Sequence, residues 1–419
     1  MGLGQRTPTE DEERHMYSGS PTGSKFAMRE MVGSKNLPII SATNFINSFF
    51  RILILTLVSI LIIGGCGPTL QQANISDQAV QLEKDQQQEI AFDTYIKRQK
   101  RLFEISFPLL SAASSMNIDD VRPTCGFAFV TQDTYKKDFQ EVARRYFNLS
   151  DKPVVYYVHP KFPAEKAGLK VGDRIVSING NGLSDKSFKE VIAIMQDSQT
   201  VKDKLFNIVV DRDGNILELN INPISCCKYN ILLVPEDRLN AFSDGKNIIF
   251  TNGMVRFCEN NDELAFVVAH EIAHNVLGHI SKKKGNVAIG SVFDVLLAVG
   301  LGVNTGGAFG KMGGAAYSKG FEYEADYAGL YIVARAGLDV SSAPNFWRRM
   351  AAENPKSTEK NFGASHPSNP ERFIAMDNTV KEIKEKQKTG KALIPEPKKE
   401  ISGGETGSLK ETTDPASRP

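Results

Sequence analysis

The segment His270-Glu271-Ile272-Ala273-His274 contains the residue types of a metal-dependent hydrolytic site. Positions four apart lie on one face of an α-helix, so His270 and His274 can bind one metal ion, with Glu271 beside them as a candidate general base. Two imidazoles and a carboxylate suit zinc and leave a fourth position open for water. Three of the six histidines lie between positions 270 and 279, so a chance match in an ordinary helix is the less favoured interpretation.

Two residues downstream are candidates for the third ligand. His279 lacks the spacing of an HExxHxxGxxH site, and its position favours a role near the helix C-terminus. Glu322 is preferred, because Glu322 and Asp326 are one helical turn apart on one face, whereas Glu324 points away from both. Asp326 could then accept a hydrogen bond from the outer nitrogen of a ligand histidine. A solvated acidic helix is the alternative for this segment taken alone.

Four motifs within residues 230–380 resemble, in their order, the gluzincin zinc metallopeptidases of the HtpX and CAAX-prenyl-protease type. They are Asn240-Ala241-Phe242, His270 to His274, Glu322 to Asp326, and Ser365-His366-Pro367 followed by Arg372. The resemblance implies a mainly helical peptidase domain with endopeptidase activity. It implies one zinc ion held by His270, His274 and Glu322, and a general base at Glu271. The chain looks more like the soluble or lipid-anchored members than the membrane-embedded ones.

Two further motifs extend this hypothesis. Asn240, Ala241 and Phe242 could form an edge strand that pairs with an extended substrate. His366 is the second candidate catalytic group, able to approach the metal or the oxyanion, and the alternative is a loop histidine before a proline. Arg372 could anchor that loop through a carboxylate.

Short β-like runs separated by turns, with one helix between them, occupy residues 119–224. The string from Pro163 to Gly180 resembles the PDZ domains of bacterial envelope proteases. The resemblance implies a small β-sandwich that binds an extended peptide as an added strand. The carboxylate-binding loop is predicted at Gly126, Phe127 and Ala128, and a rigid spacer that binds nothing is the alternative.

The N-terminal region resembles a targeting segment. Residues 52–63 form an uncharged, largely apolar run of twelve, which suits a signal sequence better than a membrane span of about 20 residues. The following Gly64-Gly65-Cys66 completes a stretch that resembles a bacterial lipobox, which implies lipid attachment at Cys66. Gly67 favours the outer over the inner membrane of the cell envelope. An uncleaved anchor and a buried helix are the alternatives.

The upstream residues are too many and too acidic for an ordinary signal sequence, so Met28 or Met31 could be the true start. The sequence thus predicts a multidomain chain with a signal and lipoprotein segment (1–66) and a helical tether (67–118). A β-rich PDZ domain (119–224) and a mainly α-helical (α+β) gluzincin metallopeptidase domain (225–383) follow. The ranges 287–302, 303–316 and 384–419 are predicted as a core helix, a glycine-rich lid and a disordered tail.

Five cysteines fit an exported protein. With Cys66 assigned to lipid, a bridge between Cys125 and Cys227 would join the two ends of the PDZ segment. Three pairings of the remaining four are possible, and buried thiols are the alternative in a reducing compartment.

The net charge is +1, from 50 Lys and Arg against 49 Asp and Glu. The sequence contains no basic stripe of the kind that binds nucleic acid, so no nucleic acid partner is predicted. The function predicted is zinc-dependent proteolysis of exported, misfolded or unassembled proteins in the bacterial envelope, facing the periplasm, with recruitment by the PDZ domain. A lipid-anchored chaperone or scaffold and a zinc amidase acting on cell-wall peptides are alternatives. The oligomeric state is left open.

Overall fold

The computed structural model describes residues 42–63, 73–116, 120–135, 137–198, 205–280, 317–353, 366 and 369–397. Residues 1–74 and 75–419 form two separate units. Cys66, Met28, Met31 and the ranges 287–302 and 303–316 lie outside the described residues, so the predictions about them stay predictions.

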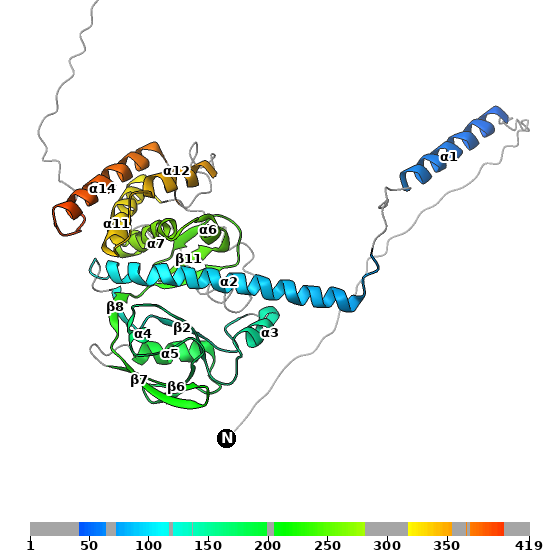
Figure 1. Ribbon diagram of the computed structural model, residues 1–419. Coiled ribbons are helices and arrows are strands. Elements are labelled where there is room, and N and C mark those ends of the chain that lie inside the picture. The colour runs from blue at the N-terminus through cyan, green and yellow to red at the C-terminus, as the bar shows by residue number, and fades with distance from the viewer. Residues whose placement is uncertain are drawn as a thin grey trace, which may run out of the picture. The chain divides into compact units, whose positions relative to one another are not determined.

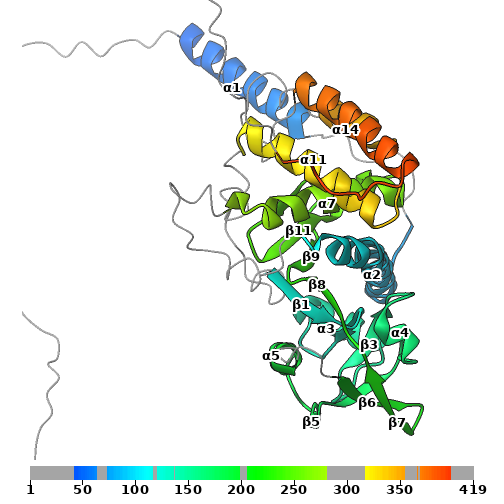
Figure 2. The same ribbon diagram turned by 90° about the vertical axis from the view of Figure 1, so that its left-hand side faces the viewer.

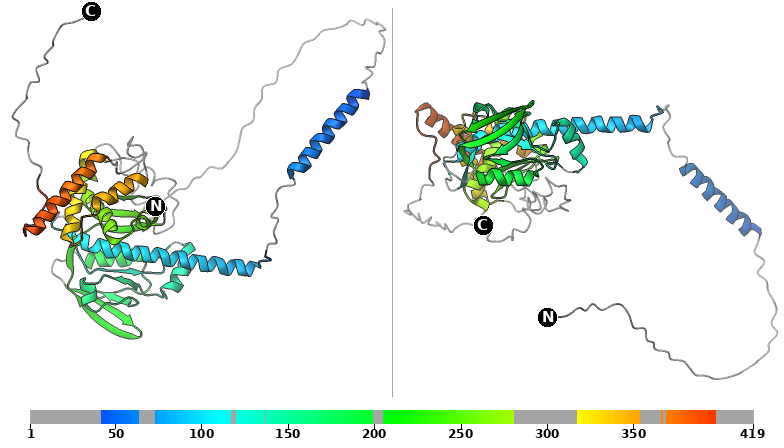
Figure 3. Two further views of the ribbon diagram at one scale, coloured as in Figure 1. Left: turned by 45° about the horizontal axis from the view of Figure 1, so that its top comes forward. Right: turned by 90° about the horizontal axis from the view of Figure 1, so that it is seen from below.

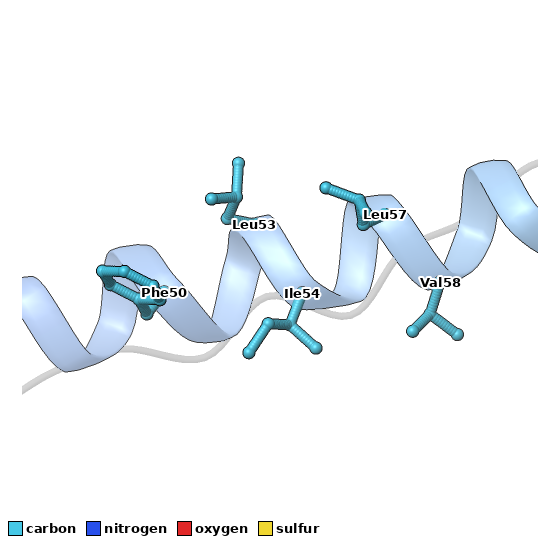
Figure 4. Close-up of a pocket in the computed structure, with 5 residues that line it drawn as sticks. All are labelled: Phe50, Leu53, Ile54, Leu57 and Val58. Atoms are coloured by element: carbon cyan, nitrogen blue, oxygen red, sulfur yellow. The ribbon is translucent and has the colours of Figure 1, made fainter.

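The first unit contains one described helix, α1 (Ala42–Ile63), which includes the apolar run. Figure 4 shows five apolar side chains projecting from this helix, namely Phe50, Leu53, Ile54, Leu57 and Val58. The shallow hollow that they line contains no polar residue, so it cannot support acid–base or metal chemistry. Across the described residues, none of the helices has the length and apolar character needed to span a bilayer.

An antiparallel sheet forms the β-rich domain of the second unit (Figure 1). Its main strands, in spatial order, are β2 (Phe127–Val130), β3 (Val154–Val158), β4 (Arg174–Ile178), β6 (Phe206–Arg212) and β7 (Asn215–Ile221). The short β5 (Asn181–Gly182) pairs with β4, and the helices are α3 (Lys137–Tyr146), α4 (Pro163–Lys166) and α5 (Phe188–Ser198). Apolar residues alternate with polar ones along β6, so that one face of the strand packs on the core, as Phe206, Ile208 and Val210 show. Strand β2 lies at the edge of this sheet.

A long helix, α2 (Asp77–Ala113), runs between the β-rich domain and the helical domain (Figures 1 and 3). It begins at Ser76, whose side chain accepts a hydrogen bond from Ala79 N. Residues 77–91 are mostly exposed, but from Phe92 onward the helix buries Leu102, Leu109 and other apolar side chains in the cores of the second unit. The helix is therefore not a simple tether, because half of it belongs to the folded body.

The peptidase-like domain combines a small sheet with packed helices (Figure 2). Strand β8 (Ile224–Cys227) pairs with β1 (Val121–Thr124), and β9 (Asn230–Val234), β10 (Ala241–Ser243) and β11 (Asn247–Thr251) form a three-stranded sheet in the order β10-β11-β9. The helices are α6 (Asn252–Phe257), α7 (Asn261–Val276), α11 (Lys319–Arg335), α12 (Ala343–Glu353) and α14 (Pro370–Lys388). The predicted combination of a β-rich domain with a mainly helical domain is confirmed.

Helices α7 and α11 approach closely because α11 has a glycine at their crossing. A Cβ atom on Gly329 would lie 3.2 Å from the backbone nitrogen of His270 and 3.3 Å from the carbonyl oxygen of Ala269. The missing side chain therefore lets the two helices that carry the candidate metal ligands pack backbone to backbone.

The predicted bridge between Cys125 and Cys227 is wrong in this structure, because the four cysteines in the described residues are buried free thiols. Cys125 packs in the core of the β-rich domain, whereas Cys227 packs in the core around α2 and α7. Backbone pairing of β1 with β8 joins the two ends of the β-rich segment instead.

The predicted disordered tail also begins too early. Helix α14 continues to Lys388 and buries Ile383 completely. The chain then folds back, so that Lys386 Nζ donates to the carbonyl oxygen of Ile394 at 2.8 Å and the backbone nitrogen of Glu396 donates to the Tyr327 hydroxyl at 3.0 Å. Residues 398–419 lie outside the described residues.

Candidate metal centre

Helix α7 positions three of the predicted site residues. It begins at Asn260, whose side chain accepts a hydrogen bond from Glu263 N at 3.0 Å. Every residue from Glu263 to Val276 is buried, so His270, Glu271 and His274 project into the domain interior. The helical spacing thus brings both imidazoles to the facing helix α11.

Four side chains converge between α7, α11 and the segment before α14. The ligand-type atoms of His270, His274, Glu322 and His366 all lie within 4.8 Å of one another. The Nε2 atoms of His270 and His274 are 3.1 Å apart, and Glu322 Oε1 lies 3.4 Å from His274 Nε2. The first three residues are at most 2% exposed, so the cluster is shielded from bulk water.

His366 lies between the two carboxylates of the cluster. Its Nδ1 is 3.0 Å from Glu322 Oε1, and its Nε2 is 3.1 Å from Glu271 Oε1. Burial alone lowers the pKa of His366, but Glu271 and Glu322 outweigh this effect and raise it to about 10. The structure therefore places His366 in direct contact with the candidate base and the candidate third ligand.

A second layer of charged groups surrounds the cluster. Asp326 Oδ1 lies 3.0 Å from His270 Nδ1, the position expected for a carboxylate that orients a ligand histidine. Arg372 is 2% exposed and binds Asp326 through two contacts of 2.7 Å. Its Nη1 also lies 2.8 Å from Glu322 Oε2. Arg372 thus bridges two carboxylates of α11, and it also ties the first turn of α14 to α11.

The protonation states of the α7 residues follow from burial and from their neighbours. Burial lowers the pKa of His274 to about 3, which keeps its ring neutral. Burial by itself raises the pKa of Glu271, but His366, with His270 and His274, outweighs this and lowers it to about 2. Neutral imidazole and ionised carboxylate are the forms that bind metal ions and accept protons.

The residues present fit a zinc ion. Two imidazoles and one carboxylate are a common zinc donor set in catalytic sites. Asp326 Oδ1 lies 3.0 Å from His270 Nδ1, and an ionised carboxylate only accepts hydrogen bonds, so this contact favours the tautomer with the proton on Nδ1 and the lone pair on Nε2, which faces Nε2 of His274. Glu271 Oε2 is buried and has no hydrogen-bond partner among the described residues, so its lone pairs are not engaged by a protein donor there.

The structure changes the interpretation of His279 and Glu324. His279 is completely buried, and its Nδ1 lies 3.0 Å from Nδ1 of His274. Its Nε2 lies 3.0 Å from Glu324 Oε2. The sequence predicts that Glu324 points away from Glu322 and Asp326; in the structure its carboxylate contacts His279, which in turn contacts His274. Sequence spacing gave no signal for this link. The link depends on the turn at Gly278, which places His279, and on how α11 packs against α7.

Aromatic rings that the sequence analysis did not identify hold the two histidines of α7. The Tyr317 ring stacks on His274 with 3.9 Å between centroids. The Trp347 ring lies 5.1 Å from that of His270. These contacts restrict rotation of both imidazoles. The sequence could not reveal them, because Tyr317 and Trp347 are more than 40 positions away from the histidines that they contact.

The predicted peptide-binding segments both lie at sheet edges. Ala241 and Phe242 belong to β10, an edge strand that pairs with β11, and Asn240 precedes it. Phe127 and Ala128 belong to the edge strand β2, and Gly126 precedes it with a φ of 80°. A Cβ atom at Gly126 would lie 2.5 Å from the Cβ of Phe162, so glycine is required for this turn.

Comparison with known proteins agrees with this arrangement. Residues 221–380 match the model of peptidase family M48, and residues 154–202 match that of the PDZ domain. The chain contains an M48 peptidase domain. This M48 domain covers β8 to β11 and the helices that carry the candidate zinc ligands, and the PDZ match covers the centre of the β-rich domain.

Three curated relatives are similar to part of this chain. The chain is 27% identical over 199 residues to the beta-barrel assembly-enhancing protease of Yersinia pestis, covering 44% of this chain and 41% of that protein. It is 30% identical over 177 residues to the mitochondrial metalloendopeptidase OMA1 of Schizosaccharomyces pombe, covering 40% and 52%. The human mitochondrial metalloendopeptidase OMA1 is 29% identical over 206 residues, covering 44% and 39%. The chain thus spans about half the length of these relatives or less.

Proposed function

We propose that this protein is a zinc-dependent endopeptidase that cleaves protein substrates. The observation that carries the proposal is the convergence of His270, His274 and Glu322 beside the ionised carboxylate of Glu271. The M48 domain and relatives named as metalloendopeptidases support the same activity. A zinc ion held by these three residues would act as a Lewis acid that polarises water and the peptide carbonyl group.

The residues of the chain supply the proton transfers. Glu271 Oε2 accepts a proton from the attacking water as the water oxygen bonds to the carbonyl carbon and the carbonyl π pair moves onto the carbonyl oxygen. The C=O bond then re-forms, the C–N bond breaks, and Glu271 delivers the proton to the leaving nitrogen. His366 Nε2, 3.1 Å from Glu271 Oε1, holds the other oxygen of this carboxylate. Asp326 and Arg372 fix the positions of His270 and Glu322. The buried surroundings exclude bulk water and strengthen these interactions.

The substrate would bind as an extended strand. Strand β10 (Ala241–Ser243) is the edge of its sheet, so its backbone can pair with a peptide segment. The edge strand β2 of the PDZ domain offers a second pairing site for a peptide terminus, beside the turn at Gly126. Recruitment at β2 followed by cleavage near β10 would raise the local concentration of a long substrate.

The cellular setting proposed is the bacterial envelope, with the protein facing the periplasm and attached to the outer membrane through lipid at Cys66. The lipobox-like sequence before Cys66 supports attachment. The name of the Yersinia pestis relative, beta-barrel assembly-enhancing protease, supports exported, unassembled proteins as the substrate class.

The experiment that tests the peptidase activity is hydrolysis of an unfolded protein by the full chain carrying Glu271→Gln. This change removes the proton acceptor and leaves all three proposed ligands in place. We expect zinc binding to persist and turnover to fall by about 10²–10⁴-fold, the usual contribution of a general base. Asp262→Asn, in the first turn of the same helix, is the matched control and retains activity.

The result that contradicts the proposal is turnover of the Glu271→Gln variant close to that of the unchanged chain. Such a chain would bind zinc for structural purposes, as expected for a lipid-anchored chaperone or assembly scaffold. Removal of zinc by a chelator, followed by readdition, provides a second measurement, because only a zinc peptidase regains hydrolysis when the metal is restored.

A further inference from the structure

The outer nitrogen of His274 faces a chain of two side chains that leads to the protein surface. His274 Nδ1 lies 3.0 Å from His279 Nδ1, and His279 Nε2 lies 3.0 Å from Glu324 Oε2. His279 is completely buried, whereas 51% of the Glu324 side chain is exposed. The ring of His279 stacks on Phe321 with 4.4 Å between centroids, which fixes its plane.

These contacts determine the positions of the protons. An ionised carboxylate can only accept, so His279 donates from Nε2 to Glu324. A neutral His279 then has a lone pair on Nδ1 and accepts the Nδ1 proton of His274. Nε2 of His274 consequently keeps its lone pair, and this is the atom that lies 3.1 Å from His270 Nε2 and 3.4 Å from Glu322 Oε1.

The two histidines of α7 are therefore oriented in different ways. His270 contacts the buried carboxylate of Asp326 directly at 3.0 Å. His274 instead has a second imidazole, that of His279, between its Nδ1 and the carboxylate of Glu324. Both arrangements leave Nε2 free of a proton and directed into the cluster.

We propose that His279 and Glu324 are positioning residues that hold His274 in its metal-binding tautomer and thereby set the affinity of the site for zinc. Neither residue belongs to the candidate ligand set. The inference rests on the proposed zinc site, and it adds a part of that site that the ligand set does not include. Groups that orient ligand histidines contribute about 10–100-fold to metal affinity.

The test measures the zinc dissociation constant of the full chain by competition with a chromogenic chelator. His279→Phe keeps a ring of similar size against Phe321 and removes the acceptor for His274. His279→Asn places an amide oxygen near the former Nδ1 and restores that acceptor. We expect His279→Phe to weaken zinc binding by about 10–100-fold and His279→Asn to recover most of the loss. Thermal unfolding of the zinc-free proteins should be unchanged, which separates tautomer control from folding.

Glu324 provides the second arm of the test. Glu324→Ala should weaken zinc binding less than His279→Phe, because water can replace a half-exposed carboxylate as the acceptor. In the double variant, Glu324→Ala should add nothing, since Glu324 acts only through His279. Glu353→Ala, an exposed carboxylate at the end of α12, is the control and should leave affinity unchanged.

Two results would overturn the inference. One is zinc affinity of His279→Phe within about twofold of the unchanged chain, well below the expected loss. The other is a double variant in which the two losses multiply. A chain that binds zinc tightly but hydrolyses no protein would refute the peptidase proposal alone, because the affinity measurements would still decide the role of His279. A chain that binds no zinc would refute both.

Discussion

Replacing Arg372 with methionine tests how strongly the second layer of charges stabilises the fold. Arg372 is 2% exposed, and its guanidinium contacts Asp326 twice at 2.7 Å and Glu322 once at 2.8 Å. Methionine fills a similar part of the volume but leaves two buried carboxylates without their cation. The pKa values of Asp326 and Glu322 are lowered in the folded protein, despite burial, with Arg372 among the main causes.

The magnitude follows from the burial of these groups. Each charge-assisted hydrogen bond contributes about 1.5–3 kcal/mol to the free energy of unfolding. The methionine variant offsets part of this loss, because it avoids the cost of removing the guanidinium from water on folding. Removing one partner of a buried ion pair typically costs about 3–5 kcal/mol. We therefore expect the free energy of unfolding of the zinc-free chain to fall by about that amount in Arg372→Met.

The assay is urea unfolding of the zinc-free protein, with Arg348→Met as the matched control. Arg348 also binds an aspartate, Asp377, at 2.6 Å, but both side chains are 41% exposed. An exposed pair contributes about 0–1 kcal/mol, so this control should unfold close to the unchanged chain. Equal, small losses in the two variants would refute the reasoning, because they would mean that the buried carboxylates do not need Arg372.

Three further predictions concern other parts of the molecule. Gly329→Ala should lower the free energy of unfolding by about 1–3 kcal/mol and weaken zinc binding, because its Cβ would lie 3.2 Å from the backbone nitrogen of His270. Thermal unfolding with and without zinc measures both losses, and an unchanged melting temperature would contradict this prediction. Dithiothreitol should leave the melting temperature unchanged, since the four cysteines in the described part of the chain are free; a fall on reduction would indicate a disulfide. Cys66→Ser should block lipid attachment and leave the precursor uncleaved or released, and mass spectrometry of the unchanged protein that finds an unmodified residue upstream of 66 as its mature N-terminus would exclude the proposed anchor.

Several features of the site could be predicted from the sequence because they lie within one helix. The spacing of His270, Glu271 and His274 fixes their relative directions on α7, and the same holds for Glu322 and Asp326 on α11. The strands of the β-rich domain were equally predictable, since alternation of apolar residues between turns depends on local order alone.

Other features depended on contacts between segments distant in the sequence. The burial of the second half of α2 was not predictable, because its composition does not show which domain it packs against. The free state of Cys125 and Cys227 depends on their belonging to different cores, a property that spacing along the chain does not contain.

The sequence by itself determined which residues can bind a metal ion and act as a base, because helical periodicity fixes side-chain direction over one or two turns. Only the tertiary structure decided how those residues are held. One example is the contact of His279 with Glu324, which are 45 positions apart. Another is the contact of Arg372 with Asp326, which are 46 positions apart. Such contacts form only when α7, α11 and α14 pack, since hydrogen bonds between side chains need their atoms within about 3 Å.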